Sequence, residues 1–146
     1  SFPRPVLESI ESAVRREEQR HRGEMRFVVE GGLSPGRLWH GQSARERAIE
    51  LFGTLRVWDT EHNSGVLVYV LLGDRAVEIV ADRGIQSRVG TAAWEGICSR
   101  MRECYARGAF EQGSVEGVRA ISDLLAQHFP PEGDNPNELP DRPVVL

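Results

Sequence analysis

The longest apolar run in the chain covers residues 66–72 and reads VLVYVLL. A strand with no polar side chain must be covered on both faces, so this run predicts a strand in the middle of a sheet that lies between helices. Residues 73–76 then predict a turn, and residues 77–82 alternate between apolar and polar side chains, as a strand nearer the edge does. We expect the rest of the chain to fold around this hairpin.

The predicted hairpin carries a testable register. If Asp74 and Arg75 form a two-residue turn, residues whose numbers sum to 149 face each other, and Leu67 pairs with Asp82. Asp82 is then expected beside residues 59–64, the loop that leads into the central strand. Because side chains alternate between the two faces, a slip by one residue would send every side chain to the opposite face.

Helical periodicity marks several other segments. Residues 5–22 combine an apolar stripe with the charged run RREEQRHR, which predicts a helix with this run on its solvated side. Ser43 and Glu46 have the spacing of a capping box, which predicts the start of a second helix that ends near Trp58. Two further helices are predicted at residues 91–107 and 114–128.

The order of these elements predicts an α/β fold. MRFVVE at residues 25–30 is a short strand, so residues 25–72 form one βαβ unit with parallel strands. Adding the antiparallel hairpin strand gives a three-layer α/β/α sandwich with a small mixed sheet and helices on both faces. In the loop 31–42, Trp39 and His40 either cap the core or line a cleft.

The length of 146 residues is enough for one domain with a core of its own. We expect this domain at residues 1–129, and residues 130–146 as an irregular tail or as a strap laid across it. Leu139 and the apolar C-terminal end favour the strap.

Composition narrows the classes of partner and compartment. With 40% hydrophobic residues, 27% charged residues and a net charge of −4, the chain is globular, and without a basic stripe we expect no nucleic-acid partner. Cys98 and Cys104 fall in one predicted helix about 9 Å apart along its axis, too far for a disulfide. No membrane span or signal-peptide core is visible, so we expect a cytoplasmic protein as the chain stands. A chain trimmed from a longer precursor would leave a membrane-associated or exported context open.

The loop 59–65 holds the best candidate chemistry. Asp59, Glu61 and Asn63 place oxygen-bearing side chains at alternate positions, as hard cations such as Ca²⁺ require. The pattern is that of the front half of an EF-hand loop, but Val70 stands where the bidentate glutamate would be, so the hairpin register would have to supply Asp82 as the missing carboxylate. The alternative is an ordinary polar turn, in which Asp82 pairs with a neighbouring arginine or caps a helix.

A second candidate lies at the opposite end of the predicted sheet. Glu30, Gly31 and Gly32 end a parallel strand there, close to the hairpin turn, and the capped helix start at Ser43 could attract an anion. A hairpin tip beside a loop explains these residues better, because the sequence has no glycine-rich phosphate fingerprint. It also has no G-x-S-x-G elbow, Walker loop or H-E-x-x-H motif.

The segment WDTEHNSGVLVYVLLGDRAVEIVADRGI resembles the TPM domain family, also called the TPM phosphatase family. The motifs that carry the resemblance are N-S-G-V-L at 63–67, the D-R turn at 74–75, D-R-G-I at 82–85 and F-E-Q-G-S-V-E-G-V at 110–118. The family includes a thylakoid protein linked to photosystem II repair and many bacterial membrane-associated proteins. The resemblance covers about residues 25–128 and implies an α/β/α sandwich for which acid phosphatase activity and calcium binding have both been proposed.

The sequence departs from the family pattern at two places. Ser64 is inserted between the asparagine and the glycine, and Asp82 with Arg83 stands where many members have a glycine and an aromatic residue. No nucleophile can be carried over to this chain.

These observations together predict a non-catalytic domain that binds a divalent cation, Ca²⁺ or Mg²⁺, or a protein partner, including a membrane-associated one. The predicted metal ligands are four side chains: Asp59, Glu61, Asn63 and Asp82. One alternative is a weak metal-assisted acid phosphatase acting on phosphate monoesters, with Arg83 or Arg75 holding the phosphate charge. Another is an interaction module that uses residues 130–146.

Overall fold

A computed structural model describes residues 2–33, 36, 41–131 and 139–146. Trp39 and His40, the loop residues for which two roles were left open, lie outside the described residues. The elements in chain order are α1 (Arg4–Glu17), the 3-10 helix η1 (Glu18–Arg20), β1 (Glu24–Glu30), α3 (Ala44–Thr54), β2 (Gly65–Leu71), β3 (Ala76–Ala81), α4 (Arg83–Val89), α5 (Thr91–Ala106), α6 (Phe110–His128) and β4 (Val144–Val145).

The four strands form one mixed sheet in the order β3-β2-β1-β4. β1 runs parallel to both β2 and β4, and β3 runs antiparallel to β2. Every residue of β2 is buried, and β3 lies at the edge. The prediction of a covered inner strand followed by an edge strand is therefore confirmed.

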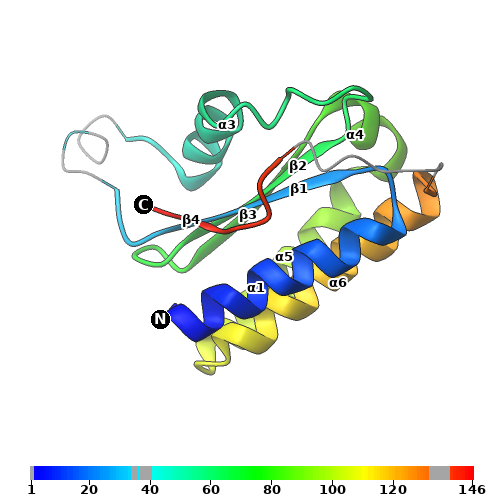
Figure 1. The fold of residues 1–146 in the computed structure, drawn as a ribbon. Helices are drawn as coiled ribbons and strands as arrows, with labels where there is room; N and C mark the ends of the chain where they lie inside the picture. Colours follow the sequence, from blue (N-terminus) through cyan, green and yellow to red (C-terminus); the bar gives the residue numbers. More distant parts are fainter. Residues whose placement is uncertain (1, 34–35, 37–40, 132–138) are drawn as a thin grey trace.

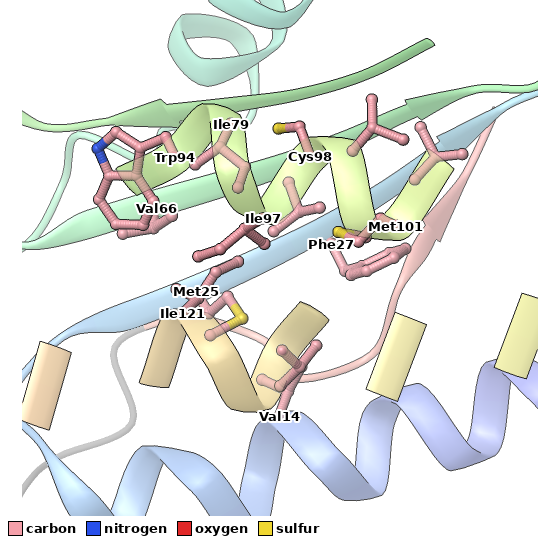
Figure 2. Packing of buried hydrophobic residues seen from close by; sticks show 14 of the residues in the cluster. Val14, Met25, Phe27, Val66, Ile79, Trp94, Ile97, Cys98, Met101 and Ile121 are labelled. Atoms are coloured by element: carbon pink, nitrogen blue, oxygen red, sulfur yellow. The ribbon is translucent and has the colours of Figure 1, made fainter. Parts of the chain in front are cut away.

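Helices cover both faces of the sheet, which confirms the three-layer sandwich (Figure 1). On one face α3 packs over Val28, Leu67 and Tyr69. On the other face α1, α5 and α6 enclose the larger core, in which Phe27 and Met101 are 1% exposed (Figure 2). The alternation of side chains along each strand assigns neighbouring residues to these two cores.

The register of the hairpin differs from the prediction by two residues. Leu67 pairs with Val80, and Leu71 pairs with Ala76, so facing residue numbers sum to 147. The turn is longer than the two residues assumed, because the Arg75 N–H donates to the Leu72 carbonyl at 3.2 Å and both residues leave the ladder. A shift by an even number keeps every side chain on its predicted face.

The helix α4 was not predicted. Residue 82 was assigned to the strand, but its side chain accepts the Arg83 N–H at 2.7 Å and caps α4. The helix is short and only Ile85 of it is buried, so its sequence lacks a full apolar period. The other helices are confirmed with shifted ends: α1 stops before η1, α3 stops at Thr54, and α6 begins at Phe110.

Residues 139–146 lie along β1 as a strap. The guanidinium of Arg26 donates to the carbonyls of Pro140 and Arg142, each at 3.0 Å. The strap ends as β4, and Leu139 is buried in the core between the sheet and α3. The two cysteines of α5 are free and buried, as predicted. Within the described residues, no helix has both the length and the apolarity that crossing a bilayer requires.

Candidate functional site

The loop 59–64 and the start of α4 meet at one end of the sheet. After α3 the chain runs to the end at which α4 lies (Figure 1), and there the Asp82 N–H donates to the Gly65 carbonyl at 2.9 Å. Asp82 thus lies beside the beginning of β2, as predicted, although its partner in the ladder is not Leu67. Asp82 lies beside the start of β2 because β3 ends at the residue before it, and not because of the register that was assumed.

The side chain of Asp82 is the most unusual group at this junction. The residue is 9% exposed, and one carboxylate oxygen, Oδ1, accepts the Arg83 N–H. The other oxygen, Oδ2, is buried and has no hydrogen-bond partner among the described residues. A buried polar atom without a partner costs about 1–3 kcal/mol. The cap of α4 therefore gives one oxygen of this carboxylate a hydrogen-bond partner and leaves the other without one among the described residues.

Main-chain carbonyls of the loop lie against the start of α4. A Cβ atom built on Gly84 would lie 2.8 Å from the carbonyl oxygen of Asn63 and 3.0 Å from that of His62. Asn63 itself has a positive φ of 52°, and the Ser64 N–H donates to the hydroxyl of Thr60 at 2.9 Å, which holds the loop in a tight bend. The glycine in D-R-G-I is thus required for the close approach of helix and loop.

The remaining predicted ligands are more exposed than Asp82. Asp59 forms an ion pair with Arg56 at 3.0 Å, and Glu61 and Asn63 are exposed. In the part of the chain that the structure describes, no group of three or more His, Cys, Asp or Glu residues is arranged to hold a metal ion. In the structure Asp82 thus lies beside the loop, whereas Asp59 is paired with Arg56. The metal site with four ligands stays a prediction.

The opposite end of the sheet, the second candidate, is occupied by a buried polar network. Both oxygens of Glu30 accept from the guanidinium of Arg47, at 2.9 and 3.1 Å, and the hydroxyl of Tyr69 donates to Oε1 at 2.6 Å. Burial, followed by the hydrogen bond to Glu30, raises the pKa of Tyr69. These groups satisfy one another, so they tie α3 to the sheet and do not form an anion site. Arg75 lies at this end, far from Asp82, in the turn between β2 and β3.

The charged run of the first helix is not a fully solvated face, contrary to the prediction. Glu17 and Glu18 are 5% and 4% exposed, and His21 is fully buried. Burial raises the pKa of Glu18, and the side chains of Asp141 and Glu24 raise it further. Burial also lowers the pKa of His21 to about 4. Nothing in the run itself indicates this, because it is covered by α6, which begins at Phe110, and by the strap 139–146.

Comparison with known proteins gives a family and several similar solved structures. A family model described as TPM domain matches residues 4–124. The solution structure of the BA42 protein from the psychrophilic bacterium Bizionia argentinensis is 27% identical, with a TM-score of 0.85 over 97% of this chain and 93% of that one. The N-terminal domain of a protein from P. gingivalis is 19% identical, with a TM-score of 0.69 over 88% of this chain and 81% of that one, and shows the fold alone. No curated protein matches the sequence.

Proposed function

The chain belongs to the TPM domain family, and from this premise we propose that it binds a divalent cation, Ca²⁺ or Mg²⁺, where the loop 59–65 meets α4. The observation that carries the proposal is the buried Oδ2 atom of Asp82, which has no hydrogen-bond partner among the described residues. An anionic oxygen withdrawn from water needs a positive or hydrogen-bonding partner. A cation beside Asp82 supplies it.

The neighbouring groups are of the type that hard cations accept. Ca²⁺ takes six to eight oxygens from carboxylates, amide side chains, main-chain carbonyls and water. The carbonyls of His62 and Asn63 lie against Gly84, two residues beyond Asp82. Main-chain and water oxygens would therefore complete a ligand set to which Asp82 contributes the buried charge.

Binding would require Asp59 to leave Arg56. Both side chains of this pair are more than half exposed, and an exposed ion pair contributes at most about 1 kcal/mol, so the exchange costs little. The loop is nevertheless not arranged for the ion in advance. We therefore expect a dissociation constant on the order of 10⁻⁴–10⁻³ M, as in weak calcium modules.

The test is a titration with CaCl₂ and with MgCl₂, followed by amide NMR and by the melting temperature. We expect saturable shifts at residues 59–65 and 82–84 and a higher melting temperature, both lost in Asp82→Asn. Asp74→Asn is the matched control, because Asp74 is an exposed aspartate at the other end of the sheet. If millimolar calcium and magnesium both leave these amides and the melting temperature unchanged, the domain does not bind a cation there.

One observation keeps the phosphatase as a second candidate. Arg83 is exposed, follows Asp82 directly, and makes no side-chain hydrogen bond or ion pair with the described residues. A guanidinium beside a bound cation could hold a phosphate monoester, whereas Arg75 lies at the wrong end of the sheet. The assay is hydrolysis of an aryl phosphate with and without Mg²⁺ or Ca²⁺. Activity that is absent, or equal in Arg83→Gln, argues against this role.

A further inference from the structure

A hollow of about 350 Å³ lies at the open edge of the sheet, away from the strap. Its walls come from α3, β3, α4 and α5, and Trp94 and Cys98 of α5 lie beside Ile79 of β3 (Figure 2). The volume is within the range of ligand sites, about 300–1,000 Å³. The residues that line it are Arg45, Glu78, Ile79, Gln86, Thr91, Trp94, Glu95, Cys98 and Arg102.

The edge of β3 offers main-chain groups to a further strand. β3 ends the sheet on this side, and hydrogen bonds to β2 come from alternate residues, as the Asp82 N–H to the Gly65 carbonyl shows. Val77, Ile79 and Ala81 therefore direct their N–H and C=O groups outward. The Ile79 carbonyl confirms this direction, because it accepts from the Arg45 guanidinium at 2.6 Å. An outer strand would meet the same row of groups.

The charges around the hollow are of both signs and are not paired with each other. Glu78, Glu95 and Arg102 make no hydrogen bond or ion pair with any described residue. All of them nevertheless lie close enough to Cys98 to affect its thiol. Burial, followed by the two glutamates, raises the pKa of that thiol to about 11, and Arg102 opposes the increase. Opposite charges that line one hollow without pairing are suited to a ligand that carries both charges.

The wall that α5 contributes to the hollow extends along most of that helix. From Thr91 to Arg102 the helix α5 rises about 16 Å, which corresponds to about five residues of an extended chain. β3, with six residues, runs alongside over about 20 Å. A wall of this length beside a strand edge fits an extended chain better than a compact metabolite.

We propose that this groove binds an extended peptide segment, which joins the sheet as a strand next to β3 and pairs acidic and basic side chains with Arg102 and Glu95. Main-chain hydrogen bonds to the β3 edge provide the affinity, and the two charged residues select the side chains. The Arg45 guanidinium occupies the Ile79 carbonyl until an N–H of the peptide replaces it. None of the residues that line this groove is a ligand of the proposed cation site, so either proposal can fail while the other holds.

The test uses three blocked heptapeptides and amide NMR of the whole chain with EDTA present. The first, Ac-Glu-Val-Lys-Val-Glu-Val-Lys-NH₂, carries both charges on one face of a strand. The second replaces each charged residue with Gln. The third, the proline peptide, has Pro at residues 4 and 5, so that whichever edge of the peptide faces β3 has lost a donor to the ladder. We expect saturable shifts at Val77, Ile79 and Ala81 with the first peptide, weaker binding of the second and no binding of the third.

Two variants and one control test the charged residues. Arg102→Gln and Glu95→Gln should each weaken binding of the first peptide about three- to fivefold, as expected for exposed ion pairs. Arg100→Gln should leave it unchanged, because Arg100 is an exposed arginine of the same helix that does not line the groove. The proposal is overturned if millimolar peptide causes no saturable shift, or if the proline peptide binds equally well. Equal binding of free lysine and glutamate would overturn it too, since the hollow would then be a small-molecule pocket.

Discussion

The imidazole of His21 gives the chain a pH-dependent stability that the structure allows us to estimate. The ring is fully buried, Nδ1 accepts the Gly23 N–H at 3.0 Å, and Nε2 lies 3.3 Å from the hydroxyl of Ser122. A second ring proton would sit at Nδ1, where it would face another donor. Together with burial, which lowers the pKa to about 4 from 6.5, this keeps the native ring neutral.

The sign and size of the effect follow from proton linkage. Below pH 6.5 the unfolded chain binds a proton that the native chain refuses until about pH 4, so the contribution of His21 to stability is complete above 6.5 and falls with decreasing pH. Between pH 7 and pH 5 the loss is about 2 kcal/mol. Glu18 acts in the opposite direction: because its pKa is raised, the native state keeps a proton that the unfolded chain releases above about 4.5, so its contribution falls as the pH rises.

Comparison with a variant that lacks the imidazole separates the pH dependence of stability due to His21 from that due to Glu18. Urea unfolding of the natural chain and of His21→Gln at pH 7 and pH 5 gives two differences in the free energy of unfolding. We expect the advantage of the natural chain to shrink by about 2 kcal/mol at pH 5. His62→Gln is the control, because His62 is exposed in the loop 59–64. A difference that does not change between the two pH values would show that the native ring binds a proton as readily as the unfolded one, and would refute the reasoning.

Three further substitutions test single contacts. Gly84→Ala should cost about 1–3 kcal/mol because its Cβ meets two loop carbonyls, whereas Gly53→Ala, in an open helical position, should stabilise by about 0.5–1 kcal/mol; equal melting temperatures would contradict this. Arg26→Ala removes two hydrogen bonds to the strap, so the β4 amides should exchange hydrogen about tenfold faster, and unchanged exchange would mean that β4 holds without them. Tyr69→Phe loses a bond to a buried carboxylate and should cost about 2 kcal/mol in urea unfolding, more than Tyr105→Phe, whose partner is a neutral hydroxyl.

Much of the architecture follows from patterns that lie within a few residues. The apolar run of β2 requires cover on both faces wherever the strand lies, and the capping box of Ser43 and Glu46 forms as predicted. The hairpin shows the limit of such patterns. Alternation fixes which face each side chain takes, but the turn hydrogen bond from Arg75 to Leu72 moves the register by two residues without changing any face.

The candidate sites depend on contacts between distant segments. The sequence predicted that Asp82 lies beside the loop 59–64, but only the structure shows that one of its oxygens is buried without a hydrogen-bond partner among the described residues. The edge groove could not be predicted, because α3 and α5 reach it from opposite sides of β3.

The sequence by itself determined the type of every long helix and strand, the mixed sheet, its two covered faces and the family, because periodicity and capping act between near neighbours, whereas the short helix α4 was missed. Tertiary structure alone decided which polar groups lose their water: Glu18 and His21 read as solvated residues until the strap and α6 cover them. The free energy of a charged or polar group depends on what excludes water around it, and that is set by segments far away in the chain.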